Sequence, residues 1–97
     1  MMADSENIVR YKGTATGRVQ GVGFRAFVQK HAIKRGIKGW VRNMSDGSVT
    51  MEAEGDKTSL EALRDDIMKG NLFIKVKALS WEEMPIKCDE DDFVILK

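Results

Sequence analysis

The sequence is poor in the residues that build disulfides, metal sites and membrane spans. Its 97 residues include one cysteine, Cys88, and one histidine. An intramolecular disulfide is therefore impossible, and a zinc site would lack its usual ligands. No apolar run approaches the roughly 20 residues that cross a bilayer, and the polar, acidic start of the chain lacks the apolar core of a signal peptide. We expect a cytoplasmic protein with a disordered N-terminal segment at residues 1–7, no membrane partner and no metal.

The chain also has little net charge, but the charge is unevenly distributed. The formal net charge is +1, which argues against a generic nucleic-acid binder with a large basic excess. Residues 1–50 carry 9 Lys and Arg against 3 Asp and Glu, whereas residues 51–97 carry 7 against 12. If the basic half lines a site, its ligand is an anion. The alternative is that the two halves of the sequence do not form two halves of the surface.

The spacing of apolar residues predicts two helices and five strands in one domain, residues 8–97. Apolar residues at every second position predict strands at 8–19, 38–44, 48–54, 73–83 and 93–96. Apolar residues at every third or fourth position predict helices at 24–35 and 57–69. The first four strands and the helices follow the order βαββαβ. This order predicts a ferredoxin-like α+β fold, in which both helices cover one face of an antiparallel sheet, with 93–96 as a short additional strand.

Local signals add detail to these elements. Asp56 or Thr58 can cap the second helix. The alternation slips near residues 77–78, which predicts a bulge. Arg10 is one of the polar residues on the outer face of the first strand. The inward face of that strand is unusually small, so another part of the chain should pass close to three of its residues, Gly13, Ala15 and Gly17.

The stretch from Gly17 to Arg25 joins the first strand to the first helix. Gly21 and Gly23 let the backbone turn tightly and allow a ligand close to the main chain. Amides of the loop and of the helix N-terminus would then point the same way, where the helix dipole favours negative charge. Arg25, in the first helical turn, adds a planar fork of donors suited to two phosphate oxygens. This pattern is typical of a phosphate-binding loop, although turn glycines and a solvated arginine would produce it too.

Asn43 is a second candidate for chemistry. It shares a face of its strand with Val41, which predicts that its amide points toward the helices near the end of the strand. A polar amide there needs hydrogen-bond partners. The alternative is an asparagine that only opens the following hairpin.

Four short motifs together resemble the acylphosphatase family. They are Gly17-Arg18-Val19-Gln20-Gly21-Val22-Gly23-Phe24-Arg25, Gly36-Ile37-Lys38-Gly39-Trp40-Val41-Arg42-Asn43, Asp46-Gly47-Ser48-Val49 and Glu54-Gly55. The resemblance covers about residues 8–70, with a looser fit to the end of the chain. The combination is specific, because a loop that ends in Gly-Phe-Arg is followed at the right distance by Gly-Trp-Val-Arg-Asn.

The resemblance implies an activity and a role for each site residue. Members of the family hydrolyse the carboxyl-phosphate anhydride bond of acyl phosphates to a carboxylate and inorganic phosphate, without metal or cofactor. Arg25 would hold the phosphoryl group, and Asn43 would hold the attacking water. Inorganic phosphate would be both product and inhibitor, and we expect a monomer. Backbone amides would bind the phosphoryl oxygens along the loop, at Gln20, Gly21, Val22, Gly23 and Phe24.

The chain departs from the family pattern at two places. Ala26 stands where an aromatic residue often follows the arginine, and Gly70-Asn71-Leu72 stands where prolines often follow the second helix. Neither place is one of the two expected catalytic positions. We therefore expect both departures to affect local packing more than activity.

Two other functional classes share this topology. An RNA-recognition module displays stacked aromatics in a Lys/Arg-Gly-Phe-Gly-Phe type of motif on its open sheet face. That motif is missing from the residues expected on this face, which include Arg10, Lys12, Thr14, Trp40 and Arg42, so no nucleic-acid partner is expected. A non-catalytic, anion-binding or accessory module is the other alternative, as in the acylphosphatase-like domains that begin hydrogenase maturation factors. The end of the chain at Lys97 favours a free-standing enzyme.

Overall fold

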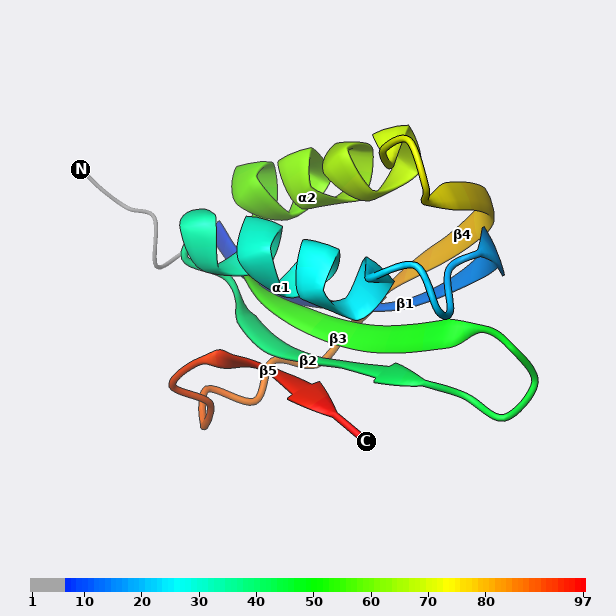
Figure 1. Cartoon of the computed structure of the whole chain (residues 1–97). Helices are drawn as coiled ribbons and strands as arrows, with labels where there is room; N and C mark the ends of the chain where they lie inside the picture. The colour runs from blue at the N-terminus through cyan, green and yellow to red at the C-terminus, as the bar shows by residue number, and fades with distance from the viewer. Residues whose placement is uncertain (1–6) are drawn as a thin grey trace.

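The computed structural model describes residues 7–97, in which two helices cover one face of a five-stranded sheet (Figure 1). The predicted fold class is confirmed. Of the N-terminal segment predicted at 1–7, all but Asn7 lies outside the described residues. In chain order the elements are β1 (Ile8–Arg18), α1 (Phe24–Lys34), β2 (Lys38–Asn43), β3 (Val49–Asp56), α2 (Lys57–Lys69), β4 (Lys75–Met84) and β5 (Phe93–Leu96).

The strand order in the sheet is β4-β1-β3-β2-β5. β1 pairs antiparallel with both β3 and β4, and β2 pairs antiparallel with β3. β5 adds to the edge of β2 as a parallel strand. Because β4 and β5 lie at opposite edges, the chain between them must cross the sheet. This crossover segment, residues 85–92, passes over the face opposite the helices (Figure 1).

Several local predictions hold. The Asp56 side chain caps α2 by accepting a hydrogen bond from the Ser59 amide at 3.3 Å. The pairing of β1 with β4 shifts register between Thr16 and Gly17, and this leaves Lys77 as the extra residue of the predicted bulge. The capping and the bulge follow from residues close in sequence, which explains why the sequence alone predicts them.

The small face of β1 is small because β4 lies against it. A Cβ atom on Gly13 would come within 2.7 Å of the Trp81 ring. At Gly17, where φ is +118°, a Cβ would lie 2.4 Å from the Lys75 carbonyl oxygen. The Trp81 ring also stacks on Tyr11, with 5.5 Å between the ring centroids. The bulge and the small residues therefore let β4 pack tightly along β1.

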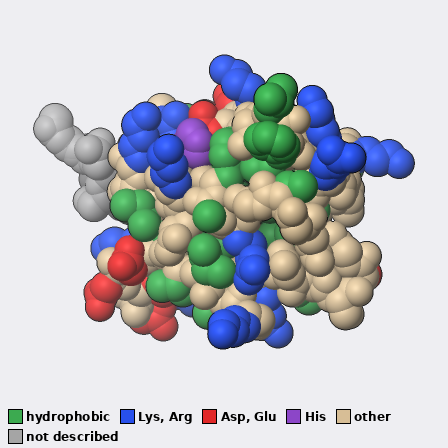
Figure 2. Space-filling model, in the orientation of Figure 1, with side chains coloured by type: hydrophobic (Ala, Val, Ile, Leu, Met, Phe, Trp, Pro, Cys, Tyr) green, Lys and Arg blue, Asp and Glu red, His purple; other side chains and the backbone are tan. Residues whose placement is uncertain are grey.

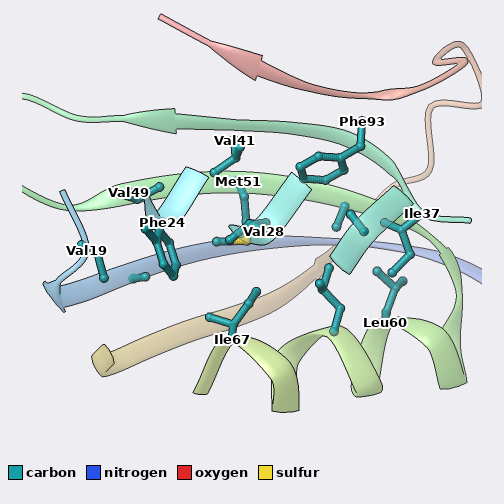
Figure 3. Close-up of a cluster of buried hydrophobic side chains, with 14 of the residues drawn as sticks. Val19, Phe24, Val28, Ile37, Val41, Val49, Met51, Leu60, Ile67 and Phe93 are labelled. Atoms are coloured by element: carbon teal, nitrogen blue, oxygen red, sulfur yellow. The ribbon is translucent and has the colours of Figure 1, made fainter. Parts of the chain in front are cut away.

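The core lies between the sheet and the two helices (Figure 3). Phe24, Val19 and Val49 gather at the end where β1 leads into α1, whereas Phe93 and Ile37 pack at the other end (Figure 3). All five side chains are buried. Both the loop that enters α1 and the start of β5 are therefore anchored to the core by an aromatic ring.

The structure adds the burial of Arg10 to what the sequence predicts. Arg10 lies on the open face, as expected, but its side chain is completely buried. The crossover segment covers it, and the guanidinium pairs with Glu52, Glu54 and Glu90.

In the described part of the chain, no helix is long and apolar enough to span a membrane. Nor does any group of three His, Cys, Asp or Glu side chains between residues 7 and 97 have the arrangement of a metal site.

Candidate active site

A cavity of about 210 Å³ opens at the end of the sheet where β1 leads into α1. The cavity brings together the two segments that the sequence singled out separately, the glycine loop and the end of β2. Four predicted site residues, Gly21, Gly23, Phe24 and Arg25, line it from the loop and the first turn of α1, and Asn43 lines it from the end of β2. Its full lining is Val19, Gly21, Gly23, Phe24, Arg25, Ala26, Asn43 and Ile95.

The loop owes its shape to two glycines in the left-handed region of backbone space. Gly21 has a φ of +76° and Gly23 a φ of +78°, values that a side chain disfavours. A Cβ at either position would meet no atom within 4 Å. The glycines are thus required by backbone conformation and not by crowding, and the space in front of them is open to a ligand.

The N-terminus of α1 faces this space without a competing anion. Gly23 is the N-cap, and its carbonyl accepts the first helical hydrogen bond from the Phe27 amide at 3.0 Å. The amides of residues 24–26, which come before Phe27 in the first turn, have no partner within the helix. The first turn contains no acidic residue and the cap has no side-chain hydrogen bond. Free amides and the positive end of the helix dipole therefore remain for a bound anion.

Arg25 lines the cavity and is steadied by the C-terminal strand. Its Nη1 donates a hydrogen bond to the carbonyl oxygen of Leu96 at 3.3 Å. None of the ion pairs among residues 7–97 includes Arg25. The guanidinium is therefore held by a neutral carbonyl, which leaves its charge for a ligand.

Asn43 is the last residue of β2 and contains an unusual atom. Its Oδ1 is buried and accepts no hydrogen bond from any of the described residues. A buried polar atom without a partner costs about 1–3 kcal/mol, so such atoms are rare in folded proteins. Because Asn43 lines the cavity, a small polar ligand that binds there could supply the missing hydrogen bond.

The side chain of Gln20 has a role that the sequence did not suggest. Gln20 and Val22 were both predicted to bind phosphate through their backbone amides, but neither residue lines the cavity. The side-chain nitrogen of Gln20, Nε2, donates to the carbonyl oxygens of Met44 and Ser48, each at 2.8 Å. Gln20 thereby joins the loop to the hairpin directly after Asn43. Because its partners lie more than 20 residues away, no local signal could have revealed this contact.

The hairpin itself is stabilised by Asp46. Its Oδ1 accepts hydrogen bonds from the Ser48 hydroxyl at 2.6 Å and the Ser48 amide at 2.9 Å. These two bonds hold the pKa of the Asp46 carboxyl below its ordinary value. With Gln20 on one side and Asp46 on the other, the turn after Asn43 has a defined shape.

Ile95 also belongs to the site, although the sequence predicts for it only a place in the short strand 93–96. It lines the cavity, and the next residue, Leu96, supplies the carbonyl that contacts Arg25. The pairing of β5 with β2 brings both to the site. A four-residue strand carries no signal for its partner strand, so the sequence could not place them here.

A glycine loop at a helix N-terminus, an arginine in the first turn and an unpaired amide on the adjacent strand agree with the family resemblance of the sequence. The family model for acylphosphatases matches residues 11–95. The chain belongs to the acylphosphatase family. It is similar to the acylphosphatase of Geobacillus thermodenitrificans (strain NG80-2), with 46% identity over 80 residues that cover 82% of this chain and 85% of the relative.

Solved acylphosphatase structures have the same architecture. The crystal structure of the acylphosphatase from Bacillus subtilis superimposes with a TM-score of 0.87 at 39% identity, covering 92% of this chain and 99% of the other. The acylphosphatase from Coxiella burnetii gives a TM-score of 0.90 at 33% identity, covering 99% of this chain and 100% of the other. The prediction that the chain is an acylphosphatase enzyme is thus confirmed at the level of the family.

Proposed function

We propose that this protein hydrolyses acyl phosphates by in-line attack of a water on a phosphoryl group, without a metal or cofactor. Arg25 and the amides of residues 20–24 hold the phosphoryl oxygens, and Asn43 orients the water. The products are a carboxylate and inorganic phosphate. Membership in the acylphosphatase family supports the substrate class, and the cavity supports the roles of the individual residues.

The chemistry requires few groups because the leaving group is a carboxylate. A carboxylate leaves without being protonated, so the enzyme needs no strong general acid. The remaining tasks are to neutralise charge on the phosphoryl oxygens and to place the water in line. Backbone amides and one guanidinium perform the first task. The proton of the water can pass to a phosphoryl oxygen, so that no separate base is needed.

The observation that carries this proposal is the position of Asn43 Oδ1. This oxygen is buried and has no donor among the described residues, and its residue lines the cavity that Gly21, Gly23 and Arg25 also line. A phosphoryl group bound by Arg25 and the loop would lie in the same cavity of about 210 Å³. A water bound to the phosphoryl group and donating to Oδ1 would satisfy the orphan oxygen. The buried amide then has a function that offsets its energetic cost.

The test compares two leaving groups. An aryl acyl phosphate should be hydrolysed rapidly, whereas nitrophenyl phosphate, a monoester, should be turned over poorly because nothing in the site protonates a poorer leaving group. Inorganic phosphate should inhibit competitively. Arg25→Ala should raise both the phosphate Kd and the KM, and even Arg25→Lys should bind poorly, since an ammonium cannot reproduce the bidentate fork. Arg42→Ala is the matched control, because Arg42 is exposed on the other face of β2.

Two outcomes would contradict the proposal. Comparable turnover of the acyl phosphate and the monoester would show that the leaving group does not control the reaction. Tight phosphate binding without any turnover would favour the alternative of a non-catalytic anion-binding module.

A further inference from the structure

The crossover segment is fastened to the face of the sheet opposite the helices. The amides of Lys87 and Cys88 donate to the two carboxylate oxygens of Glu54 on β3, at 2.7 and 3.1 Å. The Gly39 amide of β2 donates to the Asp92 carbonyl oxygen at 3.0 Å. The acidic end of the segment, residues 89–92, lies in the corner of the molecule where acidic side chains gather at the lower left of Figure 2.

Arg10 forms the centre of this attachment. Its Nη1 donates to Glu90 Oε1 at 2.6 Å and its Nη2 to Glu90 Oε2 at 3.2 Å, a two-pronged contact with the crossover segment. The same guanidinium donates to Glu52 at 2.8 Å and to Glu54 at 3.1 Å, both on β3. Burial alone would lower the Arg10 pKa, but the bonds to Glu90, Glu52 and Glu54 outweigh it and raise the pKa. Arg10 therefore stays charged and joins the crossover segment to β1 and β3.

β5 begins where the crossover segment ends and finishes at the cavity. Phe93 is buried in the core, and its carbonyl oxygen accepts a hydrogen bond from Gln29 on α1 at 3.0 Å. Three residues later, the Leu96 carbonyl accepts the 3.3 Å hydrogen bond from Arg25. Ile95, the residue before Leu96, lines the cavity. A short extended strand transmits a displacement at its start to its end, because its length is fixed at about 3.3 Å per residue.

From this chain of contacts we infer that Arg10 and Glu90 are positioning residues for Arg25, acting through the crossover segment and β5. The inference rests on the proposed role of Arg25 as the phosphate ligand. Neither positioning residue touches the cavity. Together with the buried Phe93 ring, their contact fixes where β5 starts, and β5 fixes the carbonyl that orients the Arg25 guanidinium. When the contact is lost, the guanidinium should sample orientations that do not match the phosphoryl oxygens.

Glu90→Ala tests this inference with little risk to the fold. Glu90 is partly exposed, with 23% of its side chain accessible, and Glu52 and Glu54 still neutralise Arg10 after the change. We expect the Kd of inorganic phosphate to rise about 10-fold, less than the roughly 100-fold loss that a 1 Å displacement of a catalytic group can cause. Glu90→Gln should raise the phosphate Kd less than Glu90→Ala does, because the glutamine can still accept a hydrogen bond from Arg10. Glu83→Ala, at an exposed glutamate of β4, is the matched control and should leave the Kd unchanged.

A double-mutant cycle separates positioning from general stability. Removing residues 96–97 deletes the carbonyl that Arg25 contacts. In that background Glu90→Ala should have no further effect on the phosphate Kd, because the route to Arg25 is already cut. Independent, multiplying losses in the two changes would overturn the inference. Amide hydrogen exchange on full-length Glu90→Ala gives a second measurement: exchange should accelerate at 93–96 with β1 and β3 unchanged, and a uniform acceleration would also overturn it.

Failure of the inference is distinguishable from failure of the proposed function. If Arg25→Ala leaves the phosphate Kd unchanged, the proposed role of Arg25 is wrong and the inference falls with it. A second outcome is that Arg25→Ala weakens phosphate binding but Glu90→Ala leaves the phosphate Kd within about twofold of that of the unmodified protein. Such a change is well below the expected tenfold rise, which corresponds to 1.4 kcal/mol, and only the positioning role would then be wrong.

Discussion

Asn43→Leu should make the protein more stable and nearly inactive. Leucine has almost the shape of asparagine but no polar atoms. The present Oδ1 is buried and receives no hydrogen bond from the residues that the structure describes, and such an atom costs about 1–3 kcal/mol. Removing it should therefore raise the free energy of unfolding, by about 1 kcal/mol if part of the gain is lost to imperfect packing.

Asn71 provides the opposite case in the same chain. Its Oδ1 accepts hydrogen bonds from the amides of Phe73 and Ile74, each at 2.8 Å. Asn71→Leu leaves both amides without their partner and should lower the free energy of unfolding by about 1 kcal/mol. Urea unfolding of the two variants measures both signs under identical conditions. A destabilising Asn43→Leu would show that its amide is satisfied in the folded protein and would remove the structural reason for assigning it to the water.

The same substitution should affect turnover and not phosphate affinity. In the proposed mechanism Asn43 contacts only the water, so Asn43→Leu and Asn43→Ala should lower kcat roughly 10²–10³-fold, about 3–4 kcal/mol, by analogy with the loss of one preorganised oxyanion-hole donor. The Kd of inorganic phosphate should stay close to that of the unmodified protein. A phosphate titration beside the rate measurement decides the point: loss of phosphate binding as severe as in Arg25→Ala would make Asn43 a ligand contact.

Three further predictions concern metals, the loop and acid. Activity should be unchanged in EDTA, and recovery of a chelated enzyme on adding Mg²⁺ would refute the metal-free scheme. Gly23→Ala and Gly36→Ala place a side chain at φ +78° and +70° with no atom within 4 Å, so each should cost about 1–2 kcal/mol in urea unfolding, but only Gly23→Ala should weaken phosphate binding. The Glu54 pKa is lowered because hydrogen bonds from the Lys87 amide and Arg10 outweigh burial, which alone would raise it. The ionised Glu54 carboxylate therefore stabilises the folded protein. This contribution to the free energy of unfolding is present above pH 4.5, the ordinary pKa of the carboxyl, and is lost as the pH falls through the lower pKa of the folded protein. Glu54→Gln should therefore flatten the dependence of the urea midpoint on pH below 4.5, and an unchanged slope would contradict it.

The parts of the fold that the sequence predicted are those determined by neighbours along the chain. The amphipathic period of α2 and its Asp56 cap depend on residues within one or two turns, and the bulge at Lys77 is visible as a break in the alternation within β4 itself. The glycine loop was recognisable for the same reason, because Gly21, Gly23 and Arg25 are nearly consecutive. Hydrophobic period, capping and turn chemistry all pointed to one structure at these places.

The burial of Arg10 was not predictable in this way. Alternation placed its side chain on the correct face of β1, but exposure depends on what covers that face. The covering residues lie about 80 positions later, and they pass over Arg10 only because β4 and β5 occupy opposite edges of the sheet. Sequence patterns within one strand contain no information about that crossing. The same reason explains why Gln20 and Ile95 were assigned no side-chain role in the site.

The candidate site lies where the ends of several rigid elements meet. The last residue of β2, the loop after β1, the first turn of α1 and the end of β5 all line one cavity. Three of these four ends have a feature that lowers local stability: two loop glycines fixed in the left-handed backbone region, unpaired amides at the helix start and an unpaired oxygen on Asn43. Packing does not require any of them, because the core beneath is closed by Phe24, Val19 and Val49. Phosphate and water can supply what the last two features lack, namely an anion for the amides and a donor for the oxygen. If so, bound phosphate should raise the thermal unfolding temperature of the unmodified protein, and Arg25→Ala should abolish that increase.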